Sequence, residues 1–225
     1  MQSWLPKLKG TQRFDEVVAK LNELLPASVS FQGEFDELSD QYLFEFKGAV
    51  SPFSSLSDGF KSFIGWTGDL LGHLVDVCPQ GRQISDVPGI VLVDEVDLHL
   101  HPEWQRSVIP TLAKTFPKIQ FVFTTHSPLV VSSVQQQNVF LTDVTADGSA
   151  AIRQLEEYVH GRSIEQLLLS SYFGLETTRP DAFVSASDAL FQEAAAGNSE
   201  AALSYLESLV GSDALSSKAG TKGGD

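Results

Sequence analysis

Two adjacent carboxylates, Asp94 and Glu95, follow directly on the apolar residues 90–93. A short, continuous run of mostly β-branched residues predicts a strand that is buried on both faces of a mainly parallel sheet. Ligands of such sheets bind at the carboxyl ends of the strands. At that place one carboxylate could hold a divalent metal ion, and its neighbour could orient and deprotonate water. The pair therefore predicts hydrolytic chemistry at a strand end.

Two further sites could take part in the same chemistry. Residues 119–124 read as a second buried strand, and His126 follows that strand within Thr-Thr-His-Ser-Pro. Ser57 is placed to cap a helix that starts near residue 58, and Gly59 leaves the backbone N–H groups of the first turn approachable. Free N–H groups and the helix dipole together favour an anion. Taken alone, each pattern is more often an ordinary polar turn or helix cap.

The strings around these residues resemble those of the ABC-type ATPases, in the AAA_21/OLD-like branch that is related to SMC and RecF proteins. Residues 90–95 resemble the Walker B motif, and residues 56–61 resemble the signature motif, with Asp58 where transporters usually carry Gly. The string that contains His126 resembles the H-loop. The resemblance is strong over residues 56–134 and holds only in outline elsewhere.

The resemblance implies ATP and Mg²⁺ as cofactors and assigns catalytic roles to two residues. Asp94 would bind the metal ion, Glu95 would activate the attacking water, and His126 would sense the γ-phosphate. The signature residues Ser57 and Gly59 would contact the γ-phosphate of a nucleotide held by the other subunit.

Three more residues are implied as nucleotide-binding. Lys61 is either a phosphate contact or a solvated helix residue. Asp97 and His101 belong to the loop after Walker B, where His101 takes the place of the D-loop Asp of SMC proteins.

An ATPase of this type also needs a P-loop, Gly-x-x-x-x-Gly-Lys-[Ser/Thr], whose backbone N–H groups cradle the phosphates. Residues 59–62 do not supply it, because Phe60 separates the Gly from the Lys. We therefore expect the C-terminal half of an ATPase head, with the P-loop on a preceding segment or a partner chain. Expected partners are a P-loop-bearing chain or second head, and a nuclease or DNA. The isolated chain should hydrolyse ATP negligibly. The resemblance implies a switch in bacterial defence or DNA transactions.

Two other functions stay open. The chain could be a non-catalytic interaction module that keeps the ATPase fold. It could also be a metal-dependent hydrolase that uses a cluster of acidic and histidine residues: Asp94, Glu95, Asp97, His99, His101 and His126. On an extended chain, Asp97, His99 and His101 share one face and Asp94 lies on the other. This arrangement argues against a closed metal site.

The sequence predicts that these residues are positioned by an α/β fold, in which helices flank a mostly parallel sheet. We expect this chain to form an incomplete lobe of that fold. A helix is expected near 13–25, a hairpin from strands 29–35 and 41–47, and a bend at Pro110 in the helix that starts at Pro102. A second hairpin, 139–144 with 150–155, should lie on the sheet edge. Residues 1–160 are predicted as the ATPase part, 161–210 as a helical appendage, and 211–225 as a disordered tail.

Composition limits the remaining possibilities. The net charge of −14 over 225 residues argues against a broad nucleic-acid-binding face on this chain. The single cysteine, Cys78, excludes an internal disulfide, and no apolar run approaches the ~20 residues that a membrane span needs. We expect a cytoplasmic protein with no membrane partner.

Overall fold

The computed structural model describes residue 1 and residues 3–210, and it divides the chain into two compact units, Met1–Tyr172 and Phe173–Asp225. The first unit holds all the residues predicted to do chemistry. Its short 3₁₀ helices are η1 (Leu5–Leu8), η2 (Phe53–Ser55), η3 (Ile84–Asp86) and η4 (Gln136–Asn138). None of the described helices is both long and apolar enough to cross a membrane.

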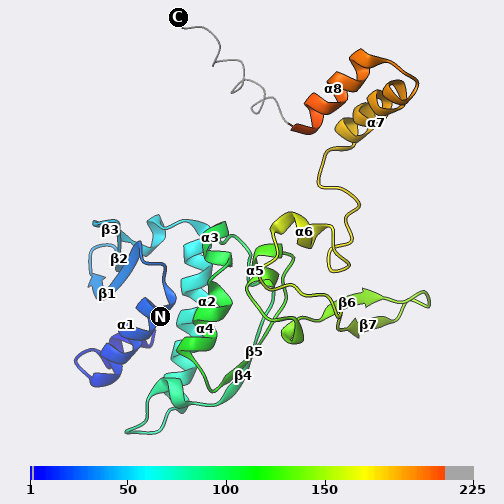
Figure 1. Ribbon diagram of the computed structural model, residues 1–225. Coiled ribbons are helices and arrows are strands. Elements are labelled where there is room, and N and C mark those ends of the chain that lie inside the picture. Colours follow the sequence, from blue (N-terminus) through cyan, green and yellow to red (C-terminus); the bar gives the residue numbers. More distant parts are fainter. Residues whose placement is uncertain (2, 211–225) are drawn as a thin grey trace, which may run out of the picture. The chain divides into compact units, whose positions relative to one another are not determined.

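An antiparallel sheet and a helix form the amino-terminal part of the first unit (Figure 1). Strands β1 (Val29–Asp36), β2 (Gln41–Phe46) and β3 (Ala49–Pro52) pair in that order, and α1 (Gln12–Leu24) contacts β1. The Asn22 amide joins the two, since it donates to the Phe31 carbonyl at 2.7 Å and accepts from the Phe31 N–H at 2.8 Å. The predicted helix and hairpin are confirmed, and β3 is an addition to them.

The long helix α2 (Asp58–Val77) is the centre of the core. Its buried face carries Phe63, Ile64, Leu71 and Leu74, as the apolar spacing predicts. The amino-terminal segment lies across its glycines. A Cβ at Gly72 would stand 2.8 Å from the indole nitrogen of Trp4, so this close approach requires the missing side chain.

Strands β4 (Gly89–Val93) and β5 (Ile119–Phe123) form the parallel sheet, in register from Gly89 opposite Ile119 to Val93 opposite Phe123. Helices α3 (Pro102–Gln105) and α4 (Val108–Thr115) connect them. This α/β arrangement, with helices beside parallel strands (Figure 1), confirms the predicted fold class. The helical segment breaks at residues 106–107 and not at Pro110, which occupies the first turn of α4, where a proline is tolerated.

Within the part of the chain that the structure describes, only one face of this parallel pair is covered. The inner face, Val91, Val93, Phe121 and Phe123, packs against the core. On the outer face, Ile90 is 68% exposed, Leu92 77% and Val122 45%. The prediction that residues 90–93 are buried on both faces is therefore wrong for the described chain. A run that is apolar at every position had indicated two covering layers, and the described residues supply one.

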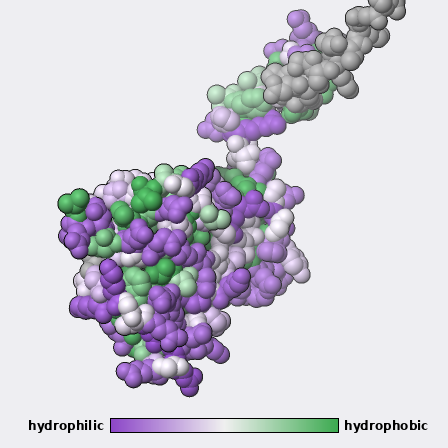
Figure 2. Space-filling view, turned by 90° about the vertical axis from the view of Figure 1, so that its left-hand side faces the viewer, coloured by the Kyte–Doolittle hydropathy of each residue, from purple (hydrophilic) through white to green (hydrophobic). Residues whose placement is uncertain are grey.

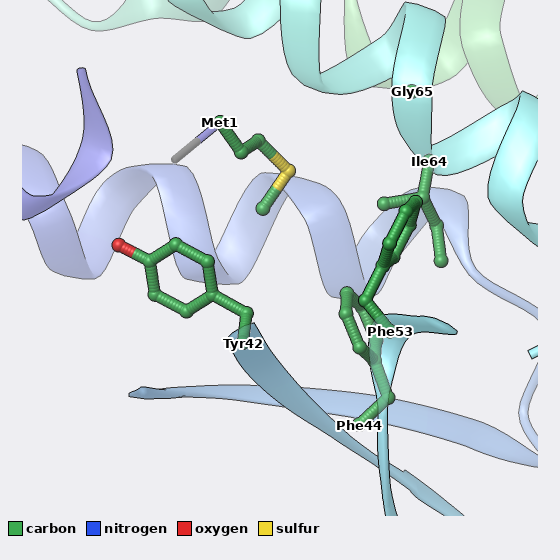
Figure 3. Close-up of a pocket in the computed structure, with 6 residues that line it drawn as sticks. All are labelled: Met1, Tyr42, Phe44, Phe53, Ile64 and Gly65. Atoms are coloured by element: carbon green, nitrogen blue, oxygen red, sulfur yellow. The ribbon is translucent and has the colours of Figure 1, made fainter. Parts of the chain in front are cut away.

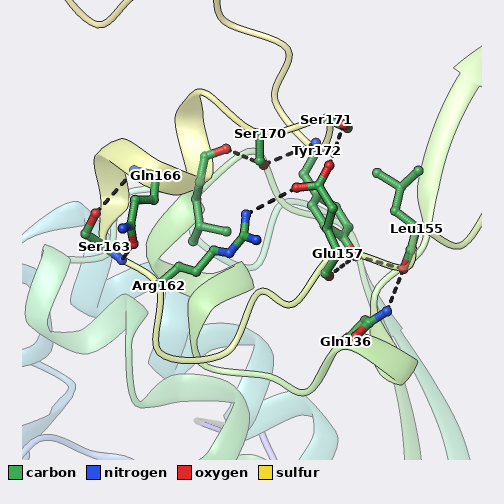
Figure 4. Close-up of polar contacts among 10 residues, drawn as sticks. Gln136, Leu155, Glu157, Arg162, Ser163, Gln166, Ser170, Ser171 and Tyr172 are labelled. Carbon is green, nitrogen blue, oxygen red and sulfur yellow. Dashed lines mark hydrogen bonds and ion pairs between the residues drawn. The ribbon is translucent and has the colours of Figure 1, made fainter.

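Hairpin β6 (Leu141–Val144) and β7 (Ala150–Arg153) forms a sheet of its own, so the prediction that it extends the parallel sheet is wrong. Helices α5 (Pro128–Ser132) and α6 (Ile164–Leu168) lie in the same region. Figure 4 shows the polar contacts that fasten the end of the unit: the Tyr172 hydroxyl donates to the Glu157 carbonyl at 3.0 Å, and the Ser171 hydroxyl donates to the Glu157 carboxylate at 2.5 Å.

The second unit consists, as far as it is described, of α7 (Asp181–Ala195) and α8 (Ser199–Val210), packed as a helical hairpin. The unit begins at Phe173 and not at the predicted residue 161, because α6 and the Tyr172 contacts belong to the first unit. The predicted disordered tail, 211–225, lies outside the described residues.

Candidate functional site

The acidic pair lies where the parallel strands end, and Thr124 of the neighbouring strand holds it. The Thr124 hydroxyl donates a hydrogen bond to the Asp94 carboxylate and accepts one from the Glu95 backbone N–H at 2.8 Å. The backbone continues this pairing, since Thr124 N–H donates to the Val93 carbonyl and Val96 N–H to the Thr124 carbonyl, both at 3.1 Å. One threonine thus orients the Asp94 carboxylate and restrains the backbone of Glu95.

Glu95 adopts a backbone conformation that is uncommon for its residue type. Its φ is +49°, in the left-handed region, and the chain turns sharply there, so that Leu98 N–H donates to the Glu95 carbonyl at 2.9 Å. Such conformations cost on the order of 1–3 kcal/mol and persist only where the surroundings impose them. The turn leaves the Glu95 side chain exposed beyond the strand end.

A second set of polar contacts joins the loops after the two strands. The Thr125 hydroxyl donates to the Asp97 carboxylate and accepts the Ser127 N–H at 3.0 Å. The Gln105 amide donates to the Leu100 carbonyl at 2.9 Å and accepts the Ser127 hydroxyl at 2.7 Å. These contacts restrain the backbone on both sides of residue 126.

His126 itself has an exposed side chain. It follows β5, directly beside the strand that carries Asp94 and Glu95. The structure therefore brings the Walker B-like acids and the predicted histidine to the same edge of one sheet.

The predicted anion site is a helix start of the expected kind. Ser57 caps α2, and its hydroxyl accepts the Phe60 N–H at 3.5 Å. The Lys61 N–H donates to the Ser57 carbonyl at 2.9 Å. The N–H groups of Asp58 and Gly59 precede these bonds, at the end where helical donors have no partner within the helix.

Gly59 has a structural reason to be glycine. A Cβ at this position would stand 2.1 Å from the carbonyl oxygen of His99, far inside any permitted contact. His99 has a φ of +60°, so a left-handed turn of the loop after β4 is pressed against the start of α2. This contact couples the predicted signature residue directly to the loop that carries Asp97 and His101.

Lys61 is engaged within its own helix. Its ammonium lies 3.0 Å from the Asp58 carboxylate, and the side chain is 33% exposed. The hydrogen bond from Lys61, followed by its charge, lowers the pKa of Asp58 below the ordinary 3.8, and the nearby His99 adds to this. In this structure Lys61 is a partly exposed helix residue paired with Asp58.

A wide hollow of about 890 Å³ opens beside the start of α2. Its lining includes Ser57, Gly59, His99, His101 and Lys47, but none of Asp94, Glu95 or His126. The predicted residues thus fall into two groups, an acidic strand-end group and a helix-start group, joined through the loop 94–101.

A smaller cavity of about 270 Å³ lies between β2, η2 and α2 (Figure 3). Met1, Tyr42, Phe44, Phe53, Ile64 and Gly65 line it, and the Tyr42 hydroxyl is the polar side-chain group among them. It contains no residue of the predicted site, so its composition indicates a gap in core packing.

Among residues 1 and 3–210, no three His, Cys, Asp or Glu side chains are grouped so that they could hold a metal ion. The six-residue cluster behind the metal-dependent hydrolase reading does not assemble. A magnesium ion that is held by one carboxylate and by substrate phosphates needs no such group. Asp94 fits that use, because Thr124 orients its carboxylate at the open strand end.

Sequence reasoning missed three residues that organise the site: Thr124, Thr125 and Gln105. The two threonines had a signal, since they follow β5 at the level at which Asp94 follows β4 in a parallel pair. No sequence signal indicated Gln105, because its contacts depend on how the loop between β4 and α3 folds back.

Comparison with known proteins places the chain in a family. Residues 9–132 match the AAA_21 family, described as "AAA domain, putative AbiEii toxin, Type IV TA system". This match spans more than half of the 225 residues. The chain therefore belongs to the AAA_21 family of AAA domains.

Curated relatives are much longer than this chain. It is 35% identical over 146 residues to a Septu protein PtuA of Bacillus mycoides, which covers 65% of the chain and 20% of that protein. It is 46% identical over 86 residues to the Retron Ec83 probable ATPase of Escherichia coli, covering 38% of the chain and 16% of that protein. An OLD nuclease of Thermus scotoductus is 27% identical over 131 residues, 54% of the chain and 25% of that protein.

Among solved structures, an SMC ATPase gives a TM-score of 0.47 at 14% identity, over 63% of this chain and 82% of that chain. An SMC head bound to the C-winged helix domain of ScpA gives 0.43 at 14% identity, over 63% of this chain and 41% of that chain.

Proposed function

We propose that the chain is the C-terminal half of an ATPase head that hydrolyses ATP to ADP and phosphate when a P-loop completes it. The observation that carries the proposal is the Thr124 bridge, which fixes Asp94 and Glu95 at the open end of a parallel strand pair. Membership of the AAA_21 family and a relative named as a probable ATPase support the same reaction.

The roles follow from the chemistry of each side chain. Asp94 would hold Mg²⁺, which supplies charge neutralisation on the phosphates when bound. Glu95 would accept the proton of the attacking water, and its exposed position leaves room for that water. His126, two residues beyond Thr124, would donate a hydrogen bond to the γ-phosphate. Phosphoryl transfer rests on this kind of positioning and charge stabilisation.

The helix-start group would serve a nucleotide on a second head. The N–H groups at Gly59 and the Ser57 hydroxyl would donate to its γ-phosphate, with the helix dipole adding to the attraction. Asp97 and His101 lie on the loop that contacts Gly59 through His99. Binding of that γ-phosphate at Gly59 would therefore be transmitted through this loop to Asp94 and Glu95. Lys61 would reach a phosphate only by leaving Asp58.

The exposed outer face of the β4–β5 pair supports a P-loop outside this chain. Ile90, Leu92 and Val122 offer an apolar surface to a further layer of protein. We propose that the polypeptide that bears the P-loop covers this face, from a preceding segment or from a partner chain. A nuclease or DNA as the responding partner, and a role in bacterial defence, rest on the names of the Septu, retron and OLD relatives.

A chimaera tests the proposal. This chain would replace the matched segment of the Retron Ec83 probable ATPase, and ATP hydrolysis would be measured for the chimaera and for the isolated chain. The chimaera should hydrolyse ATP, and Glu95→Gln should reduce the rate by about 100-fold or more while it still binds ATP. The isolated chain should show negligible activity.

Asp143→Asn, which removes an exposed carboxylate in β6, is the matched control and should leave the rate unchanged. Hydrolysis by the isolated chain that disappears with Glu95→Gln would refute the requirement for an outside P-loop. A chimaera that binds ATP but is unaffected by Glu95→Gln would refute the assignment of the base.

A further inference from the structure

The helical hairpin of the second unit exposes large apolar side chains. On α8, Leu203 is 63%, Leu206 55% and Leu209 44% exposed. We call these three residues the hairpin face. Figure 2 shows hydrophobic residues over this hairpin. Phe191 of α7 packs instead against the Tyr205 ring of α8, with 5.5 Å between the ring centroids. The three leucines are in contact with water, at a cost that a partner would remove.

Within the described hairpin, residues 181–210, the charged side chains have one sign. These residues contain five carboxylates, Asp181, Asp188, Glu193, Glu200 and Glu207, and neither a lysine nor an arginine. Arg179, which precedes α7, has its guanidinium over the Phe183 ring at 4.9 Å.

The carboxylates border the apolar residues at helical spacing. Leu203 follows Glu200 by three residues and precedes Glu207 by four, so the three side chains are neighbours on one side of α8. Both glutamates are exposed. An occupant of the hairpin face must therefore bring apolar groups for the centre and positive charge for the border.

We propose that the hairpin face binds an amphipathic helix of a partner protein, whose apolar stripe is flanked by lysine or arginine. Leu203, Leu206 and Leu209 recur every three residues along α8, which suits a helix laid beside it. Opposite charges at the border favour this partner and oppose others. A nucleic acid would meet carboxylates, and a second copy of the hairpin would place like charges together.

The surface lies wholly within the second unit and shares no residue with the acidic strand-end group. The inference therefore stands whether or not the chain is half of an ATPase head.

Binding of synthetic helices to the full 225-residue chain tests the inference. Three fluorescent peptides of about five helical turns would share one leucine stripe and carry Lys, Gln or Glu at the flanking positions. Fluorescence anisotropy should rank their affinities in the order Lys, Gln, Glu. The double substitution Leu203→Ser with Leu206→Ser should weaken the Lys peptide by about tenfold or more.

Leu38→Ser is the matched control. Leu38 is 98% exposed and follows Glu37 in the turn between β1 and β2, so it is another leucine in an acidic setting, and its substitution should not change binding. Circular dichroism would show that each variant keeps its helices. Unchanged binding in the double variant would mean that the peptide senses only the net charge of the chain. Equal loss in both variants would mean that the peptide binds exposed leucines wherever they lie. Either result would overturn the inference.

Charge reversal gives a test that leaves the leucines in place. Glu200→Lys with Glu207→Lys should invert the order, so that the Glu peptide binds most tightly. Sedimentation of the wild-type chain should show no dimer that depends on Leu203 and Leu206. Such a dimer would assign the hairpin face to a second copy, and an order unchanged by charge reversal would also overturn the proposal.

Discussion

The hydroxyl of Thr124 accepts the backbone N–H of Glu95 at 2.8 Å while it donates to the carboxylate of Asp94. Thr124, which directly follows β5, thus restrains the two acidic residues that directly follow β4. Groups that support a reacting residue in this way typically affect activity by about 10–100-fold when they are removed.

Thr124→Val tests this relationship because it keeps the side-chain volume and removes the hydroxyl. In the ATPase chimaera, the rate constant for hydrolysis should fall by about tenfold or more, with ATP affinity changed little. Thr124→Ser should restore most of the rate, since it keeps the hydroxyl. If valine and serine variants hydrolyse ATP equally, the hydroxyl does not position the acids.

Gly59→Ala should destabilise the first unit. The added Cβ would meet the His99 carbonyl at 2.1 Å, so either α2 or the loop after β4 must move, at about 1–3 kcal/mol in the free energy of unfolding. Urea titration measures this.

Gly65→Ala on the same helix is the control for the Gly59 substitution. A Cβ there meets nothing within 4 Å, and the substitution should stabilise the helix by up to about 1 kcal/mol. A Gly59 variant as stable as wild type would show that the contact with His99 yields easily.

Substitutions on the two faces of β4 should act differently. Leu92→Ser, on the exposed face, should change the stability of the isolated chain by less than about 0.5 kcal/mol. Val91→Ser, on the face packed against the core, should cost about 1–3 kcal/mol. In the chimaera, Leu92→Ser should become destabilising as well, because the P-loop-bearing region is proposed to cover it. Thermal unfolding of these three variants, compared with the unsubstituted chain and chimaera, would decide. A neutral Leu92→Ser in the chimaera would argue against that cover.

Acid should weaken the bonds that the Glu157 carboxylate makes with Ser171 and Arg162 (Figure 4). The Ser171 hydroxyl, and to a lesser degree Arg162, lower the pKa of Glu157 below the ordinary 4.5. A lowered pKa in the folded state means that Glu157 adds stability that is fully present above its unfolded-state pKa. That stability is lost as the pH falls through the lower, folded-state pKa.

Glu157→Gln should therefore destabilise the chain at pH 7, and the difference from wild type should shrink as the pH falls below about 4.5. Denaturant titrations at stepped pH values measure the difference. Ser171→Ala should raise the Glu157 pKa toward its ordinary value and move the loss to higher pH. A difference that stays constant over this range would show that the Glu157 charge does not contribute through these bonds.

Local patterns were sufficient to predict most elements. The apolar spacing behind Ser57 gave α2, and the alternation on each side of residues 36–40 gave the β1–β2 hairpin. The burial of β4 could not be predicted, because a continuous apolar run indicates two covering layers without saying which polypeptide provides them. The place of the β6–β7 hairpin was also beyond local information, since pairing with a distant strand depends on the whole fold.

The residue types of the candidate site were predictable, but the bonds that organise it were not. The position of Asp94 and Glu95 follows from the strand they terminate. The close contact of Gly59 with His99 arises where a loop folds back on a helix that precedes it by forty residues, and no spacing in the sequence encodes that contact. The hydroxyl of Thr124 acquires its role only through the parallel register of β4 and β5.

The packing of Trp4 against Gly72 places this tryptophan, like the other two, in the first unit, and this has a spectroscopic consequence. The three tryptophans, at positions 4, 66 and 104, all belong to the first unit, so emission from selectively excited tryptophan reports on that unit and not on the second, which contains Tyr205. Helical ellipticity includes α7 and α8 as well. A melting curve followed by both signals would separate the two units without any label, and a gap between the two curves would measure how independently the hairpin unfolds.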